Sequence, residues 1–359
     1  MSSNESNLHR RRFLKMSSGL VLTPALGAGL SAFSGSASAA DTNSVTVGTW
    51  GGDYQNLLES QIATPLLKPQ HLDVSFLTGD AVSRMTKLRA ERTARRPSMD
   101  VACLSDTDMA TMNESGLLTT PDLSQIKNAG NVFPSFLNAY SLPHIYSGLV
   151  IVYNTNFIKS PPDSFTAAMD PKFKGRVGFS DIIFNYCGMF CALSSGKSAS
   201  DMKAGTDFLR QLKKNAPRVY PSNEAVAAAL KSGEIWMTCM WKARALQWQQ
   251  GGVPVDFAFD KAGAIPVVFQ AAIPKNNHAP ANGYRFIDAM LDPKAQIGFA
   301  EKMGYAPTIR NAGLPPALQA KVGFTDAQVE KFQKLDYAKL TSEKEAFLQY
   351  WNTDFKVGL

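Results

Sequence analysis

The strongest constraint on the fold is a regular alternation of short apolar runs with segments of helical periodicity. The first apolar, β-branched runs are 44–50, 73–78 and 100–104. In the segment 81–94, the apolar residues Val82, Met85 and Leu88 recur at helical spacing, and Pro97 follows them. Strands that alternate with helices in this way form mainly parallel sheets covered by helices. The chain is therefore predicted to have an α/β fold.

Residues 1–40 have the pattern of an export signal. The segment 10–15, RRRFLK, matches the twin-arginine motif R-R-x-F-L-K. A mildly apolar stretch and a run of small residues follow, and they offer a cleavage site after Ala39 or Ala40. The apolar stretch is too short and too rich in glycine for a stable membrane span, although an uncleaved signal anchor is the alternative. We expect a cleaved twin-arginine signal peptide and a periplasmic protein.

Length, charge and apolar runs limit the class of protein that follows the leader. Of the 359 residues, about 320 would stay, enough for two packed lobes. The chain carries a net charge of +7, of which the leader supplies three, and the basic residues are mixed with acids. The basic cluster at 87–96 fits a solvated helix face better than a nucleic-acid site. No later run reaches about 18 apolar residues, so no spanning helix is expected.

Neither the cysteines nor any motif points to a catalytic or metal centre. The four cysteines, Cys103, Cys187, Cys191 and Cys239, lack the spacing of a disulfide framework or a metal site, and we predict buried free thiols. G-x-S-x-G, H-E-x-x-H and a G-x-G-x-x-G after a strand are missing from the sequence. We therefore expect no enzyme activity, no cofactor and no metal, with an exported carboxylate-only enzyme as the alternative.

A series of short landmarks resembles one known family. They include TWGGDY (49–54), NESGLL (113–118), PKFKGRV (171–177), MW (240–241), GVPV (252–255), AIP (272–274) and GYAPT (304–308). Each is weak alone, but their order and spacing resemble the periplasmic solute-binding proteins of ABC importers, in the branch of the spermidine/putrescine receptors. The resemblance covers nearly all of the chain after the leader.

The resemblance implies a two-lobed type 2 periplasmic-binding-protein fold, in which crossover strands join two mainly parallel sheets flanked by helices. Lobe 1 would comprise 41–150 and 269–306, and lobe 2 would comprise 154–266 and 307–359. Such a protein would close its cleft around a small-molecule solute by a hinge motion. It would act as a monomer and deliver the solute to an ABC permease in the inner membrane, without chemical turnover and without nucleic acid.

Aromatic residues near strand ends are the first candidates for ligand contact. Trp50 and Tyr54 follow the first strand, and Trp241 ends a later one. Such rings can stack on a cation or an alkyl amine, or they can belong to the core. The resemblance favours ligand contact for all three. Polyamine receptors carry an aromatic residue and an aspartate shortly before the equivalent of 272–274, where this chain has VVFQ, so Phe269 is also an expected contact but the acid is lost.

Charged residues after strands are the second group of candidates. Asp106 and Asp181 could each bind an ammonium group, or cap the helix that follows. The resemblance favours Asp181, which stands where polyamine receptors place an acidic pair, although Ile182 follows it here. Arg244 is suited to a bidentate carboxylate, or it is a surface residue at a helix start.

The expected ligand is a small amine-bearing solute. If Asp181 and Arg244 both face the cleft, a zwitterion similar to 4-aminobutyrate or to a guanidino acid fits, and Arg244 would repel a diamine. A polyamine stays open as a ligand. A ferric-ion or anion receptor of the same fold is a further alternative, although the sequence has no adjacent tyrosine pair of the kind that related iron receptors use.

Overall fold

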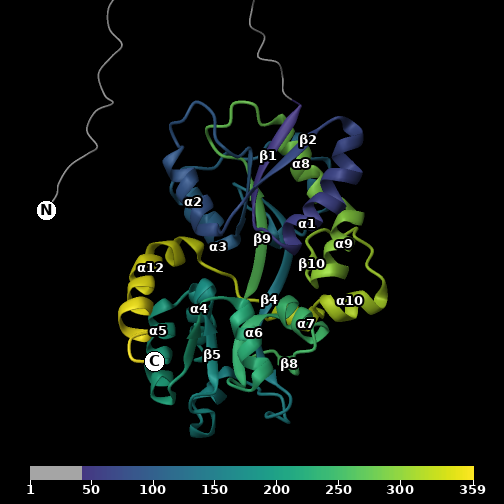
Figure 1. Ribbon diagram of the computed structural model, residues 1–359. Helices are drawn as coiled ribbons and strands as arrows, with labels where there is room; N and C mark the ends of the chain where they lie inside the picture. The colour runs from purple at the N-terminus through teal and green to yellow at the C-terminus, as the bar shows by residue number, and fades with distance from the viewer. Residues whose placement is uncertain (1–42) are drawn as a thin grey trace, which may run out of the picture. The chain divides into compact units, whose positions relative to one another are not determined.

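A computed structural model describes residues 43–359, except for the side chain of Asp326 (Figure 1). The predicted leader lies outside the described residues. The strands are β1 (Ser44–Thr49), β2 (Asp73–Thr78), β3 (Val101–Ser105), β4 (Leu142–Asn154), β5 (Val177–Ser180), β6 (Arg218–Tyr220), β7 (Met237–Trp241), β8 (Val255–Ala258), β9 (Pro266–Ala272) and β10 (Ala306–Pro307).

The helices fall between and after these strands. The α-helices are α1 (Asp53–Leu57), α2 (Ala81–Ala90), α3 (Asp106–Glu114), α4 (Phe184–Ser194), α5 (Met202–Leu212), α6 (Asn223–Ser232), α7 (Lys242–Gln250), α8 (Ala281–Met290), α9 (Pro293–Met303), α10 (Pro316–Val322), α11 (Asp326–Glu330) and α12 (Tyr337–Tyr350). The π-helix η1 (Leu58–Leu67) continues α1, and η10 (Trp351–Phe355) continues α12.

The first part of the sheet surrounds β1. Strand β1 pairs in parallel with β2 on one side and β3 on the other, and β9 pairs antiparallel with β3. Helices α2 and α8 contact β1. The parallel strands place the turns that follow β1 and β3 at the same edge of the sheet, as in other α/β folds.

The second part of the sheet surrounds β5 and β7. Strand β5 pairs in parallel with both β6 and β7. Strands β7 and β8 pair antiparallel with β4. Helix α4 contacts β5 and packs along α5, while α6 contacts β5 and α7 contacts β7. Each half therefore keeps a parallel, helix-covered unit, and antiparallel strands connect the halves.

Strand β4 belongs to both parts of the sheet. All 13 of its residues are buried. Residues 142–148 pair with β9 and 149–153 pair with β7, so the partner changes after Gly148. In Figure 1, β4 and β9 run from the group around β1 to the group around β5. This is the predicted two-lobed α/β fold with crossover strands, while the residue boundaries of the lobes stay a prediction.

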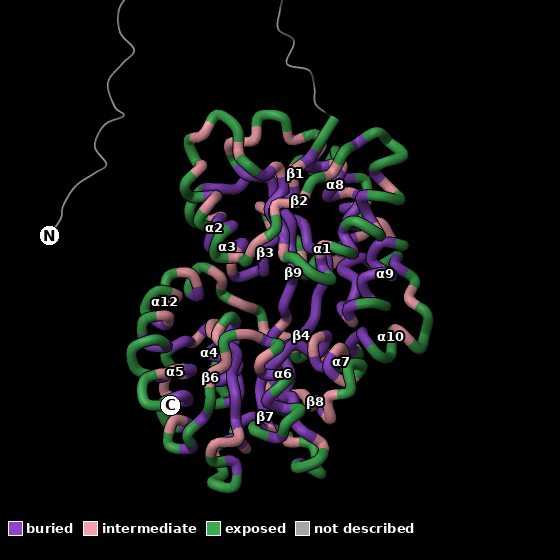
Figure 2. The backbone as a smooth tube through the Cα atoms, in the orientation of Figure 1, coloured by how far each residue is buried: buried purple, intermediate pink, exposed green. Residues whose placement is uncertain are grey.

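Burial follows this arrangement. Figure 2 shows the central strands as buried and the outer helices as mixed, with buried and exposed sides. All four cysteines are buried and free, as predicted. Within residues 43–359, no helix combines the length and the apolar composition that a membrane crossing requires.

Local sequence signals explain most helix ends, with one instructive exception. Helix α6 begins after the Ser222 cap, and Gly233 ends it at a φ of 77°; helix α9 begins after the Asp292 cap and ends before Gly304. Helix α2, predicted over 81–94, ends at Ala90, because the Glu91 carboxylate accepts the backbone N–H of Ser98 at 2.8 Å and turns the chain. The buried face also differs from the prediction, since Arg84 is buried while Val82 is 68% exposed.

Candidate functional site

A cleft of about 380 Å³ lies where β1 and β7 end, beside β9. Its lining residues are Trp50, Gly51, Gly52, Asp53, Tyr54, Ile182, Asn223, Glu224, Trp241, Arg244, Phe269, Met303 and Tyr305. Five of the seven predicted contact residues are among them: Trp50, Tyr54, Trp241, Arg244 and Phe269. The segments that line the cleft lie far apart in the sequence and are brought together by the sheet.

Backbone geometry places the aromatic side chains at the cleft. Strand β1 ends at Thr49, and Gly52 adopts a φ of 66° before α1 begins. Glycine adopts this left-handed conformation without the steric cost that a side chain would add. Trp50 and Tyr54 therefore flank a tight turn. In the same way, Trp241 is the last residue of β7 and precedes α7 directly.

The aromatic rings form one cluster with Phe269 at its centre. The Phe269 ring centroid lies 5.1 Å from that of Trp50, 5.8 Å from Trp241 and 5.3 Å from Tyr305, with interplanar angles of 77° to 85°. Trp50 is also edge-on to Tyr54 at 5.3 Å. Edge-to-face contacts hold each ring in a fixed orientation. The cleft therefore has a rigid apolar wall that suits a methylene chain.

Several polar groups in the cleft have unused hydrogen-bonding capacity. Trp241 Nε1, Asn223 Oδ1 and Arg244 Nε are buried and lack a hydrogen-bond partner. Arg244 donates from Nη1 to Gln247 Oε1 at 2.9 Å and lies 3.8 Å from the carboxylate of Glu224, which is 71% exposed. A buried polar group without a partner is costly, and a ligand that supplies the partner removes that cost. Three residues that line the cleft thus carry a polar atom whose hydrogen-bonding capacity is unused within the protein.

A buried hydrogen bond fixes the hydroxyl group of Tyr54, one of the cleft aromatics. Tyr54 OH and His144 Nδ1 share a hydrogen bond of 2.9 Å. Burial lowers the pKa of His144 to about 3, so the imidazole is neutral at physiological pH. The Tyr54 hydroxyl is therefore occupied away from the ligand, and Tyr54 offers its ring to the cleft.

Asp106 lies outside the cleft, contrary to its predicted place there. Tyr337 OH donates to Asp106 Oδ2 at 2.9 Å, and Tyr186 OH and the backbone N–H of Thr107 donate to Oδ1. Burial raises the pKa of Asp106 to about 6. The carboxyl group is fully used in a network of protein groups, and it does not line the cleft.

Asp181 also lies outside the cleft, although its neighbour Ile182 lines it. Trp351 Nε1 donates to Asp181 Oδ1 at 2.6 Å, and Lys356 forms an ion pair with the carboxylate at 3.0 Å. Both partners come from η10 and the residue after it. The predicted ammonium clamp is instead a contact between the β5–α4 turn and the C-terminal segment.

Sequence reasoning missed several cleft residues. Asp53, Asn223, Glu224 and Tyr305 were not among the predicted contacts, although Asp53 and Tyr305 stand within the landmarks at 49–54 and 304–308. Asn223 and Glu224 begin α6, a helix whose start the Ser222 cap marks. The signal for α6 is visible in the sequence, but nothing in its local sequence shows that its first turn lines the cleft.

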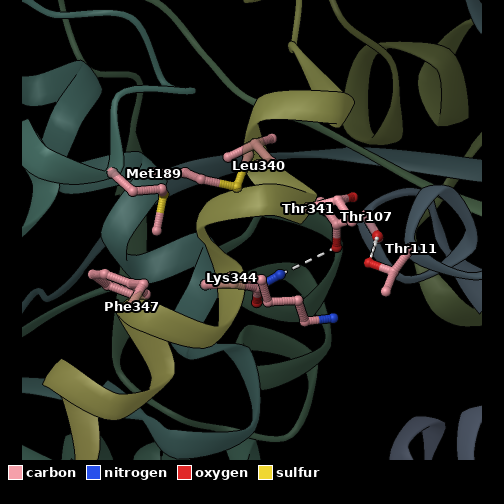
Figure 3. A pocket seen from close by; sticks show the side chains of 9 residues that line it. Thr107, Thr111, Met189, Leu340, Thr341, Lys344 and Phe347 are labelled. Carbon is pink, nitrogen blue, oxygen red and sulfur yellow. Dashed lines mark hydrogen bonds between the residues drawn. The ribbon is translucent and has the colours of Figure 1, made fainter. Parts of the chain in front are cut away.

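Two other cavities contain none of the predicted contact residues. One of about 20 Å³ lies between α3, α4 and α12, and Figure 3 shows Thr107 and Thr111 of α3 and Lys344 and Phe347 of α12 among the side chains that line it. The other, of about 500 Å³, lies beside α7 and is lined by Phe257, Phe324 and Lys242. Among residues 43–359, no group of three or more His, Cys, Asp and Glu side chains could hold a metal.

Comparison with known proteins identifies relatives along most of the chain. Residues 61–326 match the family described as bacterial extracellular solute-binding proteins. The spermidine/putrescine-binding periplasmic protein of Escherichia coli (strain K12) is 27% identical over 235 residues, which cover 61% of this chain and 67% of that protein.

Solved structures share the fold at lower identity. A GABA receptor superposes with a TM-score of 0.75 at 21% identity, covering 88% of this chain and 98% of the other. A periplasmic binding protein of A. tumefaciens R10 in complex with agropinic acid superposes with a TM-score of 0.71 at 20% identity, covering 87% and 98%. These relatives are solute-binding proteins.

Proposed function

The chain belongs to the family of bacterial extracellular solute-binding proteins and is the solute-binding component of an ABC transporter, and we propose that its cleft captures a small zwitterion with separated charges. An ω-amino acid similar to 4-aminobutyrate, or a guanidino acid, has this chemistry. The family supports the prediction of a receptor rather than an enzyme. The GABA receptor and the agropinic acid complex are neighbours in fold whose ligands carry a carboxylate.

Arg244 is the observation that carries the proposal. Its guanidinium lines the cleft, its Nε is buried without a partner, and its carboxylate neighbour Glu224 is 3.8 Å away and mostly exposed. A guanidinium in this state is suited to a carboxylate, which it can bind through two parallel hydrogen bonds. The amine end of the ligand would meet Asp53 or Glu224, the two carboxylates that line the cleft.

A polyamine is the second candidate. The E. coli relative is named for spermidine and putrescine, and the cleft combines two carboxylates with aromatic rings that can stack on ammonium groups. Arg244 counts against it, because a second ammonium group near the guanidinium would be repelled. The carboxylates of Asp106 and Asp181, which the prediction assigned to amine binding, are also occupied by other protein groups.

A ferric-ion receptor is disfavoured by the two tyrosines of the cleft. The Tyr54 hydroxyl is hydrogen-bonded to His144, and burial raises its pKa well above the usual value. Burial also raises the pKa of Tyr305 to about 12. Neither tyrosine is prepared to bind a cation as a phenolate.

The proposal also includes closure of the lobes and delivery to a permease, which the family supports, and export, which the leader motif supports. The lobes would close on the solute by bending of the crossover strands β4 and β9, and the closed monomer would present the solute to an inner-membrane permease. Export by the twin-arginine route to the periplasm rests on the motif at 10–15.

A thermal-shift and calorimetric screen tests the ligand. The purified protein is mixed with 4-aminobutyrate, 4-guanidinobutyrate, putrescine, spermidine or ferric ion. A ligand at about 100 times its Kd raises the free energy of unfolding by about 2.7 kcal/mol, and a melting curve resolves this change. We expect one of the zwitterions to give the largest shift.

Arg244→Ala sharpens this test. Loss of the charge-assisted hydrogen bonds should weaken binding of the zwitterion by about 1.5–3 kcal/mol, or about ten- to hundred-fold. Arg218→Ala, at a half-exposed arginine paired with Glu234, is the control and should bind as the wild type does. If putrescine or spermidine binds best and Arg244→Ala leaves that binding intact, the second candidate is correct instead.

A further inference from the structure

Arg84 is a buried charge without a charged partner. It lies on α2 and is 2% exposed. Its Nε donates to the Cys103 carbonyl at 2.9 Å and its Nη1 to the Gly79 carbonyl at 2.6 Å, whereas Nη2 has no partner. Within residues 43–359, no carboxylate forms an ion pair with it. Burial of a charge in this state is expensive, so such a residue calls for an explanation.

The nearest acids do not neutralise Arg84. Asp108 is bound by Lys344 at 2.7 Å and accepts a hydrogen bond from Ser105 at 3.0 Å. Asp80 accepts the backbone N–H of Ser83 as the cap of α2. Burial lowers the pKa of Arg84, but a guanidinium stays protonated at physiological pH. The positive charge therefore remains and acts on its surroundings.

A single side chain, that of Trp50, connects Arg84 to the cleft. The Arg84 Cζ atom lies 4.4 Å from the ring centroid of Trp50, within the range of a cation–π contact. Trp50 lines the cleft, whereas Arg84 does not. The guanidinium thus packs on the ring of a cleft-lining tryptophan, in buried surroundings where charge is poorly screened.

We infer that Arg84 determines the charge preference of the cleft, favouring a ligand with a carboxylate and disfavouring one with two ammonium groups. The Trp50 ring already contacts the guanidinium, so it attracts a second cation more weakly than a free indole would. The same positive charge adds to that of Arg244 and favours a carboxylate in the part of the cleft beside Trp50. This inference deepens the proposed function and rests on it.

The test compares two ligands of equal length, 4-aminobutyrate and putrescine, by calorimetry on the full protein. In the wild type, 4-aminobutyrate should bind more tightly. Arg84→Met keeps the volume but removes the charge, and it should shift the ratio of the two Kd values toward putrescine by about ten-fold. Arg84→Lys keeps the charge and should preserve the ratio within about three-fold, even if both ligands bind more weakly.

A matched control lies outside the cleft. Arg176 lies 5.0 Å from the ring centroid of Trp236 and donates to the carbonyls of Gly233 and Glu234, so it repeats the arginine–indole contact away from the cleft. Arg176→Met should leave the ratio unchanged. A shift of the ratio in this variant would contradict a local effect of Arg84.

The outcomes separate the inference from the proposed function. Equal weakening of both ligands by Arg84→Met means that Arg84 only supports Trp50, and it overturns the inference alone. A wild type that binds neither ligand overturns the proposed function and this inference with it. If Arg84→Met does not fold, Arg84→Gln takes its place, because it keeps hydrogen-bond donors without the charge: a Kd ratio shifted toward putrescine supports the inference, and an unchanged ratio contradicts it.

Discussion

At the scale of single residues, Asp106 shows how burial changes a carboxyl group. Its oxygens accept hydrogen bonds from Tyr186, Tyr337 and the Thr107 backbone, yet burial still raises its pKa to about 6. Desolvation of the charged form therefore outweighs three hydrogen bonds that favour it. The folded state holds this proton more tightly than the unfolded state does.

Stability should consequently depend on pH through Asp106. A carboxyl group with a raised folded-state pKa stabilises the fold fully below about pH 4, and this stabilisation is lost as the pH rises through about 6. Asp106→Asn removes the titration, so the free energy of unfolding of the wild type should fall by about 2–3 kcal/mol relative to the variant between pH 4 and 7. Urea unfolding at several pH values measures this difference.

The control for the pH series is Asp163→Asn, at a carboxylate that is 78% exposed. Exposed ion pairs contribute little, so this variant should stay within about 0.5 kcal/mol of the wild type throughout. A constant difference between wild type and Asp106→Asn across the series would contradict the role given to Asp106.

At the scale of elements, α4 and α5 cross at two glycines. A Cβ atom added at Gly205 would clash with the carbonyl oxygen of Gly188, and one added at Gly188 would clash with the ring of Phe347 on α12. The absence of side chains thus allows the two helix backbones to touch. No local pattern in the sequence indicates this close approach.

Gly205→Ala should therefore destabilise the protein, although alanine is the better helix former by about 1 kcal/mol. Forcing the backbones apart should lower the free energy of unfolding by about 1–3 kcal/mol net. Lys203→Ala, at an exposed position of the same helix, should change it by less than about 0.5 kcal/mol. Chemical denaturation measures both, and a more stable Gly205→Ala would disprove the close contact.

Elements were predictable where the signal was local. The Ser222 cap and Gly233 fix both ends of α6, and Asp292 with Pro293 starts α9, so the sequence alone located these helices. The end of α2 was not predictable, because it depends on a side-chain contact between Glu91 and the backbone of Ser98. Prediction failed where a contact outside the helix decided its end.

At the scale of the whole molecule, some residues of the candidate site were predictable from local signals and others were not. The aromatics Trp50 and Trp241 were predicted because strand ends converge in an α/β fold. The partners of Asp106 and Asp181 lie 231 and 175 positions away, at Tyr337 and Lys356. No local pattern can show such partners. The burial of Arg84 was not predictable either, because the apolar residues of its helix, which include Val82, indicate a different buried face.

The contact between α12 and α3 should influence ligand affinity. Lys344 binds Asp108 at 2.7 Å, and the predicted lobe boundaries place these residues in different lobes, so opening would separate them. Loss of this largely buried ion pair in Lys344→Met should lower the population of the closed form and weaken ligand binding about five-fold.

The matched control is Lys339→Met, at an exposed lysine of the same helix. Calorimetric titration of both variants with the ligand found in the screen measures the effect. If Lys344→Met binds as tightly as Lys339→Met, the α12–α3 contact does not contribute to closure.

The packing of η10 sets when the protein can reach its folded state. The rings of Trp351 and Phe355 are fully buried and lie 6.0 and 5.8 Å from Phe179 on β5. Phe179 leaves the ribosome long before its partners, by about 10 to 35 seconds at the usual rate of synthesis. During that interval β5 exposes apolar surface that later residues cover. The packing around β5 can therefore be completed only after residues 351–355 have been synthesised.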